Sequence, residues 1–123
     1  MNNNLRNIRF KQKVWLETPD GENIFGDGKY QLLKSIEKHG SLKAALEALG
    51  LSYRKTWDNL KRIEKTLGFP ILETQQGGSD GGSTTLTPEA YKLLQAFELF
   101  HTQYDQIFLE ITNKLEKDIF ESL

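Results

Sequence analysis

The stretch that decides the fold is GSLKAALEALGLSYRKTWDNLKRIEKTLG, which spans residues 40–68. Ser41 and Ser52 are side chains that cap helix starts, and Gly50 and Gly68 are residues that end helices. Apolar residues recur between them at helical spacing, so we expect one helix from Ser41 to Gly50 and another from Ser52 to about Leu67. Because only Gly50-Leu51-Ser52 joins them, the stretch predicts a helix-turn-helix.

The second of these helices divides into two faces at about 100° per residue. One face holds Tyr53, Thr56, Trp57, Leu60, Ile63, Glu64 and Leu67; the other holds Lys55, Asp58, Asn59 and Arg62, flanked by Arg54 and Lys61. Arginine and lysine read guanine or hold phosphate, and asparagine reads adenine, so this outward face predicts a DNA-reading helix. The plainer interpretation is a solvated helix face, and Asp58 favours it unless the carboxylate accepts from cytosine or orients a neighbouring arginine.

Working outward toward the N-terminus, residues 5–18 alternate apolar and polar side chains at about period two, which predicts a strand region. Pro19-Asp20-Gly21 is a turn sequence, and residues 22–25 read as a short returning strand. We therefore expect a hairpin that pairs 8–18 with 22–25. A further helix is expected from Lys29 to Lys38, before the helix-turn-helix.

Working outward in the other direction, residues 71–74 and 84–86 read as two short strands around a glycine-rich segment. A hairpin directly after the presumed DNA-reading helix is the wing of a winged helix-turn-helix. The alternative is a phosphate-binding loop, which needs Gly-Lys-Ser/Thr at a helix start; no lysine stands in this segment. The wing interpretation is therefore preferred.

Thr87-Pro88-Glu89 is a helix start, and no glycine or proline follows it, so we expect one long terminal helix. Its apolar residues recur at steps of three and four and are too many to bury on a domain of this size. A second copy of the same helix is the economical partner. The predicted dimer contacts are Leu94, Phe97, Tyr104, Phe108, Ile111 and Leu115, with His101 as a polar residue in the interface.

Composition excludes several classes of protein. The 123 residues contain no cysteine and two separate histidines, which rules out thiolate chemistry and disfavours a metal site. No long apolar run is present, and the first residues lack an export-signal pattern, so we expect a cytoplasmic protein without a membrane partner. Paired carboxylates stand near no nucleophile in a recognisable spacing. We therefore expect neither an enzyme nor a cofactor.

Two motifs resemble one known family. Residues 52–57 read Ser-Tyr-Arg-Lys-Thr-Trp, and residues 77–87 carry Gly-Gly-x-x-Gly-Gly ending in Leu-Thr. Together with Gly40-Ser41-Leu42 followed by two alanines, they resemble the DNA-binding domain of the ModE-type molybdate-responsive transcription regulators, which are relatives of the LysR-type winged helices. The resemblance covers about residues 5–120.

The resemblance implies a winged-helix homodimer, held by the first strand region and the long helix, on a palindromic operator. It places Ser52, Tyr53, Arg54 and Lys55 at the DNA end of the recognition helix, Trp57 in the core, and the glycines in the wing. Regulators of this kind carry molybdate-binding domains after the long helix. Because this sequence stops at Leu123, we expect those domains, and molybdate sensing, to be absent.

The sequence thus predicts a mainly α fold with small β-hairpins: a winged helix-turn-helix over residues 1–86 and a C-terminal dimerisation helix over 87–123. The expected function is sequence-specific binding of double-stranded DNA by a homodimer, with the recognition helix at about 52–67 and the wing at 73–86. A separate effector protein is a possible further partner. The predicted DNA contacts are Ser52, Tyr53, Arg54, Lys55, Asn59, Arg62, Gly78 and Gly81. The alternative is a dimeric protein-interaction module with weak or no DNA binding, which Glu73, Asp80 and the lack of cations in residues 66–86 favour.

Overall fold

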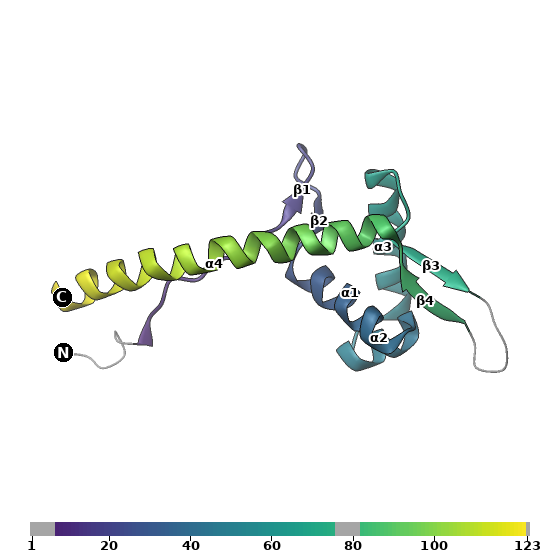
Figure 1. Ribbon diagram of the computed structural model, residues 1–123, viewed down its shortest axis with the longest axis horizontal. Helices are drawn as coiled ribbons and strands as arrows, with labels where there is room; N and C mark the ends of the chain where they lie inside the picture. Colours follow the sequence, from purple (N-terminus) through teal and green to yellow (C-terminus); the bar gives the residue numbers. More distant parts are fainter. Residues whose placement is uncertain (1–6, 76–81, 123) are drawn as a thin grey trace. The chain divides into compact units, whose positions relative to one another are not determined.

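The structure is a computed structural model that describes residues 7–75 and 82–122 (Figure 1). The elements follow the order β1 (Leu16–Glu17), β2 (Asn23–Phe25), α1 (Asp27–His39), α2 (Leu42–Leu49), α3 (Tyr53–Leu67), β3 (Leu72–Gln75), β4 (Ser83–Leu86) and α4 (Pro88–Ser122). The chain forms two compact units: Val14–Ala96, and the two terminal segments Met1–Lys13 and Phe97–Leu123. The mainly helical fold with two small hairpins confirms the predicted fold class.

The three short helices of the Val14–Ala96 unit share one apolar core. Each helix turns its apolar face inward, and the side chains buried there include Leu33 and Ile36 of α1, Ala45 of α2 and Ile63 of α3. Burying a large aliphatic side chain contributes about 1.5–3 kcal/mol, so this shared core holds the helices against one another. The polar face of α3 remains on the outside.

The helix boundaries follow the predicted caps. Ser41 Oγ accepts a hydrogen bond from the Ala44 amide at 3.0 Å, and Ser52 Oγ accepts one from the Lys55 amide at 3.3 Å. Gly50 and Gly68 end α2 and α3 in the left-handed region that glycine adopts without strain. Helix α1 begins at Asp27, two residues before the predicted start, because an acid in the first turn suits the helix dipole.

Strands β3 and β4 form the predicted hairpin after α3, with Leu72 opposite Leu86 and Gln75 opposite Ser83. Thr87, which is 1% exposed, secures its base. The Thr87 hydroxyl donates to the Pro70 carbonyl at 2.7 Å, and its oxygen accepts from the Ala90 amide at 3.1 Å. One side chain therefore closes the hairpin and caps the start of α4.

The N-terminal hairpin is much shorter than predicted. Only Leu16 and Glu17 pair with β2, and the register shifts between them. Residues 8–15 form no strand, so the predicted pairing of 8–18 with 22–25 is wrong over most of its length. Alternating side chains cannot reveal whether a backbone partner is within reach. The Phe10 amide instead donates to the Glu116 carboxylate at 2.7 Å, within the terminal unit.

The terminal unit combines residues 7–13 with the part of α4 after Ala96. Glu116 is 6% exposed; besides the Phe10 amide it meets Arg9, whose Nε lies 3.7 Å from the carboxylate. Several large apolar side chains of this part of α4 are exposed: Leu99, Phe100, Ile107, Leu109, Ile111, Leu115 and Ile119. The helix is nevertheless too polar for a membrane span, and none was found among the described residues.

Candidate nucleic-acid interface

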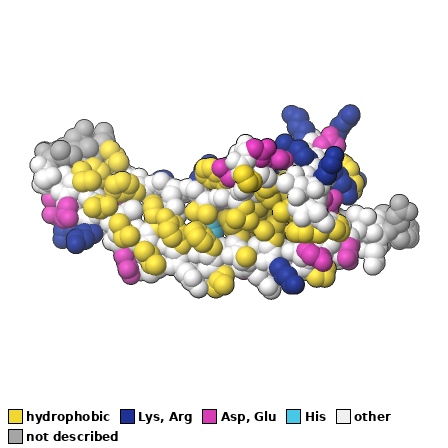
Figure 2. Space-filling model, turned by 90° about the horizontal axis from the view of Figure 1, so that it is seen from above, with side chains coloured by type: hydrophobic (Ala, Val, Ile, Leu, Met, Phe, Trp, Pro, Cys, Tyr) yellow, Lys and Arg dark blue, Asp and Glu magenta, His cyan; other side chains and the backbone are white. Residues whose placement is uncertain are grey.

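The exposed face of α3 is strongly cationic. Arg54, Lys55, Lys61, Arg62 and Lys65 all stand on the surface, and Lys and Arg side chains gather over this helix in Figure 2. The acidic side chains on the helix are Asp58, which is exposed, and Glu64, which is half-buried. A positively charged helix face of this kind matches the phosphate-lined grooves of DNA.

The predicted contacts at the start of α3 lie together. Ser52, Tyr53, Arg54 and Lys55 occupy the cap and the first turn, and all four are exposed. This is the end of a helix where backbone N–H groups and the helix dipole favour an anion. Arg54 and Lys55 therefore stand where phosphate and base contacts add to the field of the helix itself.

The other two predicted contacts on α3, Asn59 and Arg62, have different surroundings. Asn59 is half-buried, and Arg62 Nε lies 3.4 Å from a Glu22 carboxylate oxygen that follows the β1 turn. Lys29 of α1 is close to the same pair: its own burial, and then the charge of Arg62, lower the pKa of the Lys29 ammonium. The positive charge of Arg62 is thus partly balanced within the chain.

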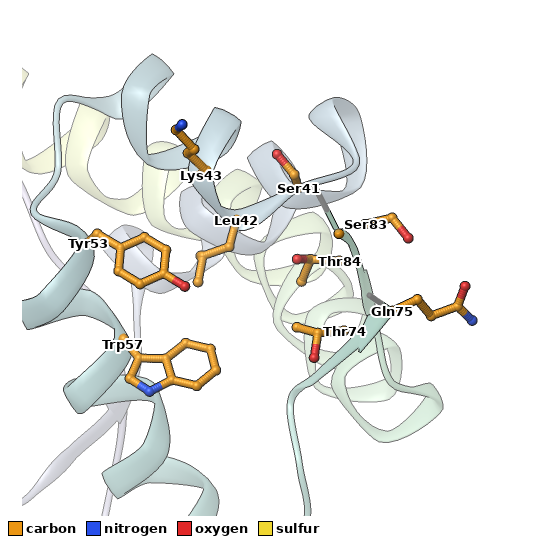
Figure 3. A pocket seen from close by; sticks show the side chains of 10 residues that line it. Ser41, Leu42, Lys43, Tyr53, Trp57, Thr74, Gln75, Ser83 and Thr84 are labelled. Atoms are coloured by element: carbon orange, nitrogen blue, oxygen red, sulfur yellow. The ribbon is translucent and has the colours of Figure 1, made fainter. Parts of the chain in front are cut away.

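An open cleft of about 730 Å³ lies between the helix-turn-helix and the strands of the wing. Its lining comes from three elements and the loops beside them: Ser41, Leu42, Lys43, Tyr53, Trp57, Thr74, Gln75, Gly82, Ser83 and Thr84. Figure 3 shows Tyr53 and Trp57 projecting from α3 toward the wing strands. The cleft thus has one aromatic wall, while hydroxyl and amide side chains form the opposite wall.

The aromatic wall corrects one prediction. Trp57 was expected in the core, but it is half-buried and lines the cleft. The Tyr53 ring stacks on it with 6.2 Å between centroids and 8° between planes. Lys61 Nζ lies 4.5 Å from the centre of the Trp57 ring. Positions 53, 57 and 61 are each one helical turn apart, so they form a ladder along the flank of α3.

Glu64 continues this ladder to the root of the wing. Its carboxylate lies 3.1 Å from Lys61 Nζ and accepts a hydrogen bond from the Ile71 amide at 2.6 Å. Bonds to a charged acceptor are stronger than neutral ones, so Glu64 fixes where the chain enters β3. Sequence reasoning missed this role; the pairing of a half-buried acid with a lysine three residues earlier was the available signal.

The wing itself is only partly described. The predicted contacts Gly78 and Gly81 lie outside the described residues. The described strands, 72–75 and 83–86, contain Glu73 and neither lysine nor arginine. Lys43 of α2, on the cleft lining, is therefore the cation nearest in sequence to the helix start at Ser41 that also faces the wing.

The residues predicted to pair two α4 helices divide by burial. Leu94 and Phe97 are 2% and 6% exposed in the single chain. Tyr104 and Phe108 are half-buried, whereas Ile111 and Leu115 are exposed. The first two have little surface left to offer a partner, so we leave them out of the interface proposed below.

The order α1-α2-α3 followed by an antiparallel hairpin, with a cationic face on α3, defines a winged helix-turn-helix. Residues 28–91 match the family described as bacterial regulatory helix-turn-helix protein, lysR family. The match includes all three helices and the hairpin, and the chain belongs to this family of DNA-binding transcription regulators.

Curated relatives carry related names. The chain is 37% identical over 86 residues to the transcriptional regulator ModE of Haemophilus influenzae, covering 69% of this chain and 34% of that protein. It is 31% identical over 98 residues to the molybdenum-pterin-binding protein MopB of Rhodobacter capsulatus, covering 80% and 36%. The molybdenum transport protein ModE of Azotobacter vinelandii is 26% identical over 109 residues, covering 89% and 40%. The chain spans little more than a third of the length of these relatives.

Proposed function

We propose that the chain is a sequence-specific DNA-binding transcription regulator that acts as a homodimer in the cytoplasm. Helix α3 enters the major groove of double-stranded DNA, and the hairpin β3–β4 lies beside it as the wing. The observation that carries this proposal is the cationic first turn of α3 next to the cleft, in a chain of a regulatory helix-turn-helix family.

The proposed contacts divide by their chemistry. Arg54 and Lys55, exposed on the first turn, supply charge to phosphates and donors to base edges, and Ser52 adds a hydroxyl. Arg62 and Asn59 lie further along the helix and contribute less, because Glu22 balances Arg62. Gly78 and Gly81 remain proposed backbone contacts of the wing.

The homodimer is proposed from the exposed side chains of α4. Phe100, Ile107, Ile111 and Leu115 are exposed and follow one another at steps of seven, four and four, which places them on one stripe of the helix. Tyr104 and Phe108 lie on the same stripe. A two-fold axis through such a stripe pairs two chains and makes a palindromic operator the natural target.

The relatives' names refer to molybdenum, but the chain spans little more than a third of their length. We therefore propose for this chain only the DNA-binding part of such a regulator. The signal that controls it, whether a ligand or a separate effector protein, is assigned to none of its residues.

A second candidate function is a dimeric protein-interaction module on the same scaffold. The described wing strands carry Glu73 and no cation, which weakens the case for a DNA-contacting wing. This candidate predicts weak DNA binding that differs little between sequences.

The test is selection from a pool of randomised double-stranded DNA by the purified full chain at near-physiological salt. The proposal predicts an enriched palindrome whose half-sites are about one helical turn, or a multiple of it, apart. A folded Arg54→Ala variant should enrich that site poorly. Failure of the wild-type chain to enrich any sequence would favour the interaction module.

A further inference from the structure

Tyr53 differs in character from its neighbours on α3. It is the first residue of the helix and is 54% exposed, between the Ser52 cap and two cations. A large aromatic side chain at the exposed tip of a cationic helix gains little within the chain. Aromatic rings on binding surfaces are strong contributors because they present much area at a small entropic cost.

The ring is also held in place before any ligand arrives. One face of Tyr53 is turned to Trp57, and Lys61 lies over the Trp57 ring. Lys61 is in turn paired with Glu64, which binds the amide of Ile71 at the root of the wing. This chain of contacts restricts the rotation of Tyr53, so its position is set by the root of the wing.

We propose that the Tyr53 ring contacts the 5-methyl group of a thymine in the major groove, with Trp57 and Lys61 as positioning residues. The inference rests on the proposed function. Thymine is the base that offers an apolar group in the major groove, and apolar side chains read it there. Base edges are met by the first residues of a recognition helix, which is where Tyr53 stands.

The surrounding charges favour this DNA contact over a protein partner. Arg54 and Lys55 follow Tyr53 directly, and Lys43 lies on the lining of the same cleft. These cations hold the phosphates on either side of a groove, whereas the ring adds no charge. Tyr53 therefore contributes discrimination between bases, and the cations contribute affinity.

The experiment uses the duplex recovered from the randomised pool, with each thymine replaced in turn by deoxyuridine, which removes only the methyl group. Loss of one contacted methyl should weaken binding by the wild-type chain about fourfold, since a buried methyl contributes about 0.8 kcal/mol. The same replacement should change binding by Tyr53→Ala less than about 1.5-fold at that position. Tyr53→Phe keeps the ring and should keep the fourfold ratio.

Two further variants separate reading from general weakening. Lys55→Ala is the matched control: it should weaken both duplexes equally and leave the thymine-to-uracil ratio unchanged. Lys61→Ala, measured beside its thermal unfolding curve, should reduce the ratio while the fold is retained, because the ring pair loses its cation. A merely structural role for Lys61 would alter the unfolding curve without altering the ratio.

The outcomes separate the inference from the function on which it rests. A recovered duplex whose uracil replacements never change affinity, or change it equally for wild type and Tyr53→Ala, overturns the thymine contact alone. Recovery of no duplex overturns both the contact and the proposed function.

Discussion

Helix α3 and the part of α4 after Ala96 are both amphipathic, but they use their faces in opposite ways. The apolar face of α3, with Leu60 and Ile63, is buried within one chain, and its polar face is exposed and cationic. The α4 segment keeps Phe100, Ile107 and Ile111 exposed, and Glu116 is buried instead.

The difference shows which unit a single chain can complete. The Val14–Ala96 unit has its own core and presents a finished charged surface. The terminal unit leaves an apolar stripe in water, and a stripe of that kind marks an interaction site. We therefore expect substitutions on α3 to change DNA binding without changing assembly, and substitutions on α4 to do the reverse in the first place.

The largest expected effect comes from placing a charge in the α4 stripe. Ile111→Glu should raise the dimer dissociation constant about 100-fold or more, because an unpaired charge would be buried in both copies. Sedimentation velocity across a range of concentrations measures this shift. The matched control is Asn113→Glu, at an exposed position off the stripe. Equal dimerisation of the two variants would remove the stripe from the interface.

The next effect is expected at the first turn of α3. Arg54→Ala and Lys55→Ala should each weaken binding to the recovered duplex about tenfold, since loss of one base or phosphate contact costs about 1–3 kcal/mol. Both side chains are exposed, so circular dichroism and sedimentation should remain unchanged. Lys117→Ala, which removes a cation from the terminal unit, is the control. Unchanged duplex binding by both α3 variants would contradict the assignment of the helix.

A smaller effect, on stability, is expected at Glu64. Glu64→Ala removes the acceptor of the Ile71 amide and the partner of Lys61, and should lower the free energy of unfolding by about 2 kcal/mol. Glu47→Ala, at an exposed position of α2, should change it by less than about 0.5 kcal/mol. Chemical denaturation measures both. Equal stabilities would show that Glu64 does not anchor the wing.

The smallest expected effect is a gain. Glu22→Gln removes the carboxylate that balances Arg62 and should strengthen duplex binding about twofold at low salt, an effect that screening reduces at higher salt. Glu121→Gln removes the same charge from the terminal unit and should have no such effect. Fluorescence anisotropy at two salt concentrations decides between them; weaker binding by Glu22→Gln would show that Glu22 supports the interface.

The elements that the sequence predicts well are those whose signals are local. Ser41 and Ser52 bond to backbone amides three residues away, and Gly50 and Gly68 adopt the left-handed conformation that ends a helix. Thr87 likewise caps α4 as expected. These residues lie within one turn of the boundary that they specify, so their role can be read directly from the order of residues.

The features that the sequence does not reveal depend on distant neighbours. The Phe10 amide bonds to Glu116, a residue 106 positions away, so the alternation in residues 8–15 wrongly suggested a strand. Trp57 was assigned to the core by its helical phase, but the cleft beside the wing leaves it half-buried. The ladder from Tyr53 to Glu64 and the balance of Arg62 by Glu22 likewise emerge only from the folded chain.

The most direct test of the account is to repeat the selection from randomised DNA with the wild-type chain and with Ile111→Glu. The account predicts that the wild type enriches a two-fold-symmetric site, and that Ile111→Glu enriches one half-site with lower affinity. That result would separate reading by α3 from assembly by α4. Enrichment of the same complete palindrome by Ile111→Glu, or of no sequence by the wild type, would contradict it.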